Sequence, residues 1–325
     1  MSFDRSALAR ATHAHGPVMR VVIVRVRGST PREVGASMLV WPGGQSGTIG
    51  GGELEFQAAA RARKQAQPRA LVTLPLGPEL GQCCGGAVTL LLERFDIADT
   101  AMPLPYARPL DPHDDPADMP QSVARLVQDG ALDGPTVLEG WFIEPELRPA
   151  HSLWIYGAGH VGRAIVGVMA PLPDWRITWV DTSPSRYPAT REPGVSYLPA
   201  VKPADAVRHA PDHAEHIILT YSHEMDLEIC HRLLSRDFAY AGLIGSDTKW
   251  ARFRTRLAQL GHGPAHISRI TCPIGDPGLG KHPQAIAVGV AADLLTRARA
   301  ASHAAKDGAT GDMTMTQDAD QGAGA

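Results

Sequence analysis

The chain has little cysteine, few aromatic residues and no excess of charge, and each shortage excludes a class of protein. Four cysteines among 325 residues are too few for a scaffold built from disulfides. With 31 Lys and Arg against 34 Asp and Glu, the net charge is −3, so no nucleic acid is expected as a partner. Aromatic residues make up only 6% of the chain, which argues against a surface that stacks bases. No apolar run approaches the roughly 18 residues that cross a bilayer, so no membrane partner is expected.

The rest of the composition is typical of a folded globular protein. Hydrophobic residues are 44% and charged residues 20% of the chain. At about 150 residues per domain, this length predicts two domains. The first residues, MSFDRSALARATHAHG, contain no apolar signal core, so we expect a cytoplasmic protein with reduced thiols.

A small α/β domain is expected over residues 1–95. Strands are predicted at Val18–Val26, Ala36–Trp41, Ala70–Leu76 and Ala87–Leu92, and a helix at Glu53–Lys64. Residues 96–150, which include a stretch with six prolines, predict a linker or an irregular excursion. Within this segment, a short helix at Ser122–Asp129 and a strand pair over Thr136–Pro149 are alternatives. Residues 301–325 have no core-building side chains and predict a disordered tail.

The second domain, residues 151–300, alternates predicted strands and helices with short connections, which indicates a doubly wound parallel sheet of the Rossmann type. Gly157, Gly159 and Gly162 form a G-x-G-x-x-G turn between its first strand and helix, and Asp181 ends the next strand. Such glycines let a pyrophosphate approach the backbone, and Asp181 would accept from ribose hydroxyls. The pattern predicts NAD or another nucleotide without a 2′-phosphate; the alternative is a purely structural turn. His223 follows the third predicted strand, at the sheet edge where such folds bind ligands.

Two glycine-rich loops of the first domain are candidate sites. In Gly47–Glu53, the amides of Gly50, Gly51 and Gly52 precede a helix, which suits an anion; a tight structural turn is the alternative. In Gly81–Gly86, Cys83 and Cys84 stand between glycines. They are candidate metal ligands, sulfur carriers or nucleophiles, and two small buried residues in a turn are the alternative.

These segments resemble the XdhC/CoxI family. The resemblance rests on GSTPREVGASML (28–39), GTIGGGELE (47–55), LGQCCGGAVTLLLE (80–93), LWIYGAGHVGRAI (153–165), LTYSHEMDLEI (219–229), LIGSDTKWARFRTRL (243–257) and CPIGDPGLGKHPQAIAVGVAADLL (272–295). The matches run in order through both domains, and the doubled-cysteine loop and GTIGGG are far more specific than the glycine fingerprint.

The resemblance implies a maturation factor rather than a metabolic enzyme. Family members of this kind bind the molybdenum cofactor, protect it while a cysteine desulfurase helps to sulfurate it, and deliver it to apo xanthine dehydrogenase. Contacts with molybdenum-cofactor biosynthesis proteins and a homodimer are further implications.

The implied cofactor residues are Ser29, Arg32, Gly50, Gly51, Gly52, Gln82, Cys83, Cys84, Gly85 and Gly86, with Cys83 and Cys84 as candidate molybdenum thiolates. No catalytic residue is assigned.

Two other functions remain open from the residues alone. An NAD-dependent oxidoreductase would use the glycine turn and Asp181, although no proton donor paired with a substrate-binding cation can be named. A carrier of metal or sulfur would use Cys83 and Cys84 and leave the second domain without a role.

Overall fold

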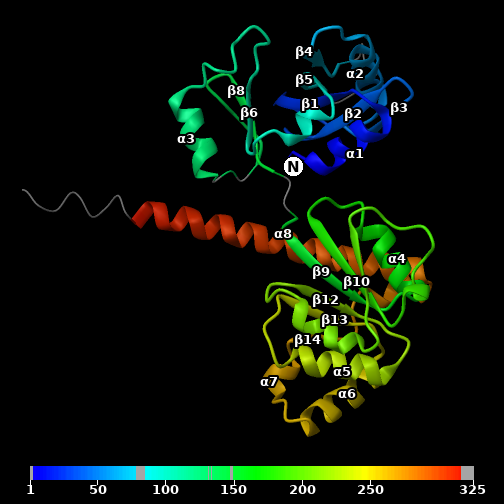
Figure 1. Cartoon of the computed structure of the whole chain (residues 1–325). Helices are drawn as coiled ribbons and strands as arrows, with labels where there is room; N and C mark the ends of the chain where they lie inside the picture. Colours follow the sequence, from blue (N-terminus) through cyan, green and yellow to red (C-terminus); the bar gives the residue numbers. More distant parts are fainter. Residues whose placement is uncertain (1–2, 78–84, 131, 133, 147–148, 316–325) are drawn as a thin grey trace, which may run out of the picture. The chain divides into compact units, whose positions relative to one another are not determined.

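In a computed structural model, the chain forms two compact units, Met1–Arg148 and Pro149–Ala325. The structure describes residues 3–77, 85–130, 132, 134–146 and 149–315. Each unit has its own sheets and its own hydrophobic clusters (Figure 1).

The first unit is built on a five-stranded antiparallel sheet with the order β3-β2-β1-β5-β4. Its strands are β1 (Val18–Arg27), β2 (Ser37–Trp41), β3 (Gly44–Gly47), β4 (Arg69–Pro75) and β5 (Ala87–Phe95), accompanied by α1 (Arg5–His15) and α2 (Gly52–Lys64). Alternate residues of β1 face opposite sides of the sheet. Val21 and Ile23 pack in the cluster that contains α2, whereas Val22 and Val24 pack in a separate cluster with Phe142.

Residues 96–150 are not the irregular linker that their prolines predict. They contain η2 (Ala98–Ala101), β6 (Tyr106–Pro109), α3 (Gln121–Asp129), β7 (Thr136–Leu138) and β8 (Trp141–Glu144). The three strands form a second antiparallel sheet with the order β6-β8-β7. The short helix and the strand pair considered within this segment are present as α3 and as β7 with β8. The linker prediction failed because these strands are three or four residues long, too short for a periodic pattern, and because Phe142 is buried against β1 and β5.

Four buried charges join the two sheets of this unit. Arg20 on β1 donates two hydrogen bonds to Glu144 on β8, at 2.8 and 2.7 Å. Arg108 on β6 donates two to Glu93 on β5, at 2.9 and 2.7 Å, and lies 2.6 Å from a Glu144 oxygen. Each of the four residues is at most 3% exposed. Two guanidinium groups therefore neutralise two carboxylates between the sheets.

The second unit has a six-stranded parallel sheet with the order β11-β10-β9-β12-β13-β14. The strands are β9 (His151–Tyr156), β10 (Trp175–Asp181), β11 (Val195–Pro199), β12 (Glu215–Ile218), β13 (Tyr240–Leu243) and β14 (Ile270–Thr271). In chain order this is 3-2-1-4-5-6, the doubly wound order of dinucleotide-binding domains. The predicted Rossmann-like fold is confirmed.

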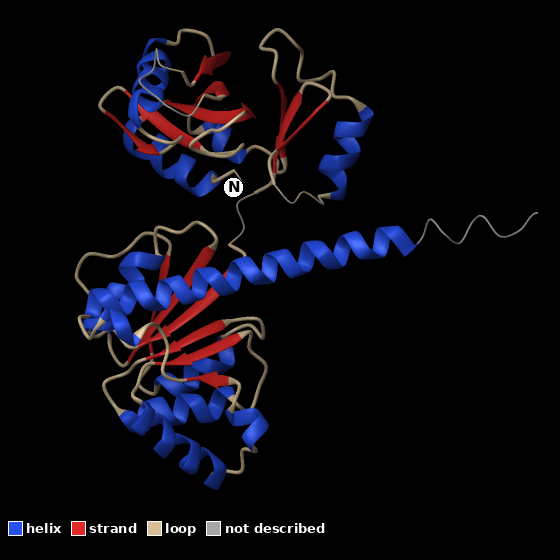
Figure 2. Cartoon of the chain, turned by 180° about the vertical axis from the view of Figure 1, so that it is seen from behind, coloured by secondary structure: helices blue, strands red, loops and turns tan. Residues whose placement is uncertain are grey.

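Helices cover both faces of the parallel sheet. They are α4 (His160–Met169), α5 (His223–Leu233), α6 (Asp247–Gln259), α7 (Pro264–Ile267) and α8 (Pro283–Met315), with 3-10 turns η3 (Pro184–Arg186), η4 (Pro203–His209) and η5 (Pro277–Leu279). One hydrophobic cluster contains residues of α4 and α8, and the other contains residues of α5 and α6. Figure 2 shows α8 running along one face of the strands. Helix α8 extends to Met315, so the first part of the predicted tail is helical; residues 316–325 lie outside the described chain.

Candidate functional site

Three motifs of the first unit meet around the turn at residues 28–32. Ser29 forms a β-bridge with Gly85, at the end of the doubled-cysteine loop. Gly86 lies so close to this turn that an added Cβ would meet the carbonyl oxygen of Ser29. From the other side, a Cβ on Gly50 would lie 2.6 Å from Cγ of Pro31. The glycines at 50 and 86 are therefore required for close packing of three segments that are far apart in the sequence.

A carboxylate of the protein itself occupies the GTIGGG turn. Glu55 Oε2 accepts hydrogen bonds from the amides of Ile49, at 3.2 Å, and Gly51, at 3.0 Å, and from the Thr48 hydroxyl, at 2.6 Å. The Gly50 amide donates to Thr48 Oγ1 at 3.1 Å. Two of the three amides predicted to bind an anion thus have acceptors within the chain.

Gly52 differs from its neighbours in this turn. As the first residue of α2, it has an amide without an intrahelical acceptor, and the described residues provide no other. Gly51 has φ +75°, and nothing lies within 4 Å of the position of its Cβ. Open space and the Gly52 amide therefore remain available beside the three meeting motifs.

The doubled-cysteine loop is described only at its C-terminal end, Gly85 and Gly86. Gly85 donates its amide hydrogen to the Leu76 carbonyl at 2.9 Å, and Leu76 donates to Gly86 at 2.7 Å. Gln82, Cys83 and Cys84 lie outside the described residues. Among the described residues, no group of three or more His, Cys, Asp or Glu side chains is arranged to hold a metal ion.

Arg32 is engaged by its neighbour. Its Nε and Nη2 atoms donate to the two carboxylate oxygens of Glu33, each at 3.2 Å. The hydrogen bond from Arg32 is the main cause that lowers the pKa of Glu33. Ser29, by contrast, has an exposed side chain in the same turn.

The glycine turn of the second unit has two packed glycines and one open one. A Cβ on Gly157 would meet the carbonyl oxygen of Leu219, and one on Gly162 would meet that of Gly157. Gly159 has φ −73°, which any residue can adopt, and nothing lies within 4 Å of its Cβ position. Neither packing nor backbone conformation requires glycine at 159. The space in front of it fits the approach of a phosphate to the start of α4.

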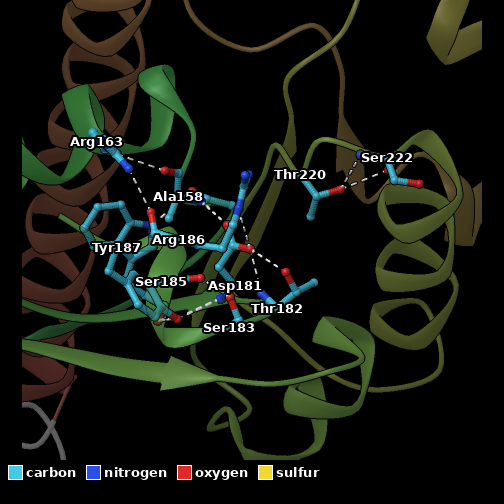
Figure 3. A network of polar contacts seen from close by, with 12 residues as sticks. Ala158, Arg163, Asp181, Thr182, Ser183, Ser185, Arg186, Tyr187, Thr220 and Ser222 are labelled. Atoms are coloured by element: carbon cyan, nitrogen blue, oxygen red, sulfur yellow. Dashed lines mark hydrogen bonds and ion pairs between the residues drawn. The ribbon is translucent and has the colours of Figure 1, made fainter.

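Asp181 is 3% exposed and is bonded within the protein (Figure 3). One oxygen accepts from the amide of Ala158 in the glycine turn, and the other from the amide and hydroxyl of Thr182, at 2.6 and 3.1 Å. Arg186 Nε adds a bond at 3.3 Å. Three of these four donors bond to Oδ1 and only the Ala158 amide bonds to Oδ2, so one acceptor position remains on Oδ2. Because Asp181 is buried, a ribose hydroxyl reaches that position only if the surrounding residues move.

Arg186 and Tyr221 face each other beside this turn. The Arg186 guanidinium lies 4.9 Å from the centre of the Tyr221 ring, and Tyr221 is 63% exposed. Arg186 follows β10 and Tyr221 follows β12, the two strands on either side of β9. Arg163 holds the turn together by donating to the carbonyls of Ala158, at 3.1 Å, and Arg186, at 2.8 Å (Figure 3).

A buried ion pair lies farther along the same edge of the sheet. Asp226 is 0% exposed, accepts from the amide and hydroxyl of Thr220, at 2.8 and 2.7 Å, and lies 2.6 Å from Lys249 Nζ. His223 begins α5 at this edge with an exposed ring, edge-on to Phe253 at 6.4 Å. The structure thus places His223 at the predicted edge, while Asp226 and Lys249 fix the adjoining loops.

The two described cysteines are unsuited to nucleophilic chemistry at neutral pH. Cys230 is fully buried in the core, and burial raises its pKa. Cys272 is half-buried, and burial raises its pKa to about 11. Both are therefore thiols rather than thiolates.

Sequence reasoning missed the ion pairs and Arg186. A signal existed for the charges inside strands, because Arg20 and Glu93 interrupt apolar runs. Arg186 and Lys249 lie in polar segments that look like ordinary surface. Of the described helices, none is long and apolar enough to cross a membrane.

Comparisons with known proteins identify the two units separately. Residues 11–74 match the XdhC and CoxI family, and residues 153–294 match the XdhC Rossmann domain. An uncharacterized protein of Escherichia coli, YqeB, is 25% identical over 294 residues. That alignment covers 88% of this chain but 44% of YqeB, so the chain spans less than half the length of this relative.

A solved structure extends the likeness to nearly the whole chain. The crystal structure of a xanthine dehydrogenase from Bacillus halodurans is 24% identical, with a TM-score of 0.66, and the match covers 92% of this chain and 96% of that one. At this identity the likeness concerns the fold. Because the two family matches together span more than half of the chain, in order and one on each unit, the chain belongs to the XdhC and CoxI family.

Proposed function

We propose that this protein is an accessory factor for xanthine dehydrogenase that binds the molybdenum cofactor, protects it during sulfuration and delivers it to the apoenzyme. Family membership supports an accessory role. The observation that carries the cofactor site is the meeting of the GSTPR turn, the GTIGGG turn and the C-terminal end of the doubled-cysteine loop in one unit. A cysteine desulfurase and apo xanthine dehydrogenase are the proposed partners.

The residues at this meeting point suit an anionic ligand. The cofactor carries a phosphate, for which the Gly52 amide and the Ser29 hydroxyl are donors with open space beside them. The thiols of Cys83 and Cys84, as thiolates, are soft ligands of the kind that binds a thiophilic metal centre. Glu55 competes with any ligand anion for the Gly51 amide, which favours a site that releases its cargo.

Retention of the cofactor tests this function directly. The full-length protein is mixed with free molybdenum cofactor and gel-filtered, and molybdenum and oxidised pterin are measured in the protein peak. We expect nearly one cofactor per chain, and loss of both in the double variant Cys83→Ser/Cys84→Ser. Cys272→Ser is the matched control, because it replaces a half-buried thiol in the other unit. Retention by the double variant would exclude the thiolate role, and no retention by the folded wild type would exclude the function.

A nucleotide at the glycine turn of the second unit is a second function that a specific observation favours. Gly159 lies at the start of α4, and nothing lies within 4 Å of the position of its Cβ, so packing does not explain the glycine there. The adjoining sheet has the strand order of dinucleotide-binding domains. We expect Gly159→Val to abolish nucleotide binding while the variant stays folded, as measured by calorimetric titration and circular dichroism. Gly167→Val, at a helix glycine that also has nothing within 4 Å of its Cβ position, is the control.

A further inference from the structure

We propose that the second unit selects a nucleotide whose ribose carries a phosphate group, the chemical class of NADP, and that Arg186 binds that phosphate. The inference rests on the proposed nucleotide site at the glycine turn. It reverses the preference that Asp181 suggests in the sequence.

The first step of the argument concerns Asp181. Selection of an unphosphorylated ribose needs a carboxylate with free acceptor positions, because the carboxylate accepts from ribose hydroxyls and repels a phosphate. Here the carboxylate is buried and already accepts from Ala158, Thr182 and Arg186, so the acceptor position left on Oδ2 is not accessible to a ribose hydroxyl. Asp181 is therefore a positioning residue that ties the glycine turn to the loop after β10.

The second step concerns charge. The guanidinium of Arg186 neutralises Asp181, and Arg163 adds a second positive charge to the same loop through its bond to the Arg186 carbonyl. Two guanidinium groups against one carboxylate give this corner a net positive charge. A phosphate placed there meets attraction rather than the repulsion that an isolated carboxylate would exert.

The third step concerns the donors that remain. Arg186 uses Nε for Asp181, and within the described residues its two terminal nitrogens donate no hydrogen bond to the protein. Its side chain is 39% exposed. Ser183 and Ser185, in the same loop, share a hydrogen bond of 2.8 Å at the surface and add hydroxyl donors. A guanidinium with two free nitrogens beside hydroxyls is a common phosphate-binding arrangement.

The fourth step concerns the base. Tyr221 presents an exposed ring beside Arg186, from the loop that follows β12. A nucleotide base can stack on this exposed ring. The pair therefore recognises a base and a ribose phosphate at one end of the site, while Gly159 admits the pyrophosphate.

Titration of the full-length protein with NADP⁺, NAD⁺, 2′,5′-ADP, 3′,5′-ADP and 5′-AMP tests the proposal. We expect NADP⁺ to bind at least tenfold more tightly than NAD⁺, since a charge-assisted pair of hydrogen bonds contributes at least that factor. Preference for 2′,5′-ADP over both 3′,5′-ADP and 5′-AMP supports the NADP class. Preference for 3′,5′-ADP would indicate a coenzyme A type of ligand and overturn the proposal.

Variants separate the roles of the two side chains. Arg186→Met should reduce the ratio of NADP⁺ to NAD⁺ affinity to nearly one, whereas Tyr221→Ala should weaken both nucleotides alike. Arg176→Met is the control, because Arg176 is exposed at the start of β10, the strand that precedes the Arg186 loop; it should leave the affinity ratio unchanged. Binding of NAD⁺ as tightly as NADP⁺ would overturn the proposal and leave nucleotide binding intact. If folded protein binds none of these nucleotides, both the proposal and the nucleotide site are wrong.

Discussion

The buried charges between the two sheets of the first unit give the sharpest test of how that unit is held together. Replacing Glu144 by Gln removes one negative charge and leaves two arginines facing a single carboxylate, Glu93. Because all four side chains are buried, solvent cannot compensate the unpaired guanidinium. Removing one partner of a buried ion pair costs about 3–5 kcal/mol. In a unit of this size, that lowers the melting temperature by about 10–15 °C.

Hydrogen exchange followed by mass spectrometry measures this unit by itself. Peptides from β5 and β8 report the free energy of opening of the first unit, whatever the second unit does. The control is Glu146→Gln, which removes a partly exposed pair with Arg5 at 3.0 Å and should cost less than about 1 kcal/mol. The double variant Arg20→Met/Glu144→Gln restores neutrality and should be more stable than Glu144→Gln.

The pH dependence of stability gives a second readout for the same residue. Burial alone would raise the pKa of Glu144, but Arg20 and Arg108 more than offset it and hold the pKa below its usual value of 4.5. The ion pairs therefore stabilise the unit above pH 4.5, and this contribution is lost as the pH falls through the lower pKa of the folded state. Glu144→Gln should abolish this part of the loss of stability at low pH. A variant within 1 kcal/mol of wild type, with the same acid profile, would refute the reasoning.

Three further predictions concern the second unit. Lys249→Met leaves its fully buried carboxylate partner, Asp226, without its ion pair and should lower the unfolding free energy by about 3–5 kcal/mol. Arg232→Met, which removes an exposed ion pair, should lower it far less. Urea denaturation compares the two variants, and equal losses would contradict the ion-pair argument. Gly162→Ala would push a Cβ into a main-chain oxygen and should destabilise strongly, whereas Gly159→Ala should change the melting temperature little. Burial, with a smaller effect from a nearby arginine, lowers the pKa of His216 to about 3, so this unit should lose stability as the pH falls from about 6.5 toward 3. His216→Gln should lessen that loss. The same pH profile of hydrogen exchange at β12 in variant and wild type would contradict this role of His216.

The Rossmann-like fold and the position of its glycine turn follow from the amino-acid sequence alone. Alternating strands and helices leave few arrangements for a parallel sheet, and the turn is encoded by residues close together in the chain. Close packing requires glycine at 157 and 162, whereas the Cβ position of Gly159 faces open space. The sequence also marked the segments of the first unit that meet in space, because their glycines and cysteines are unusual in any context.

How these segments and their charges interact depends on the folded structure. It showed that residues 106–144 form a sheet, since short strands acquire their burial from partners far away in the chain. It placed the Glu55 carboxylate on the amides expected to receive an anion. It also buried Asp181 among donors of its own unit and set Arg186 against Tyr221. A residue type indicates that a side chain can accept or donate a hydrogen bond, but its actual partner depends on distances that only folding fixes.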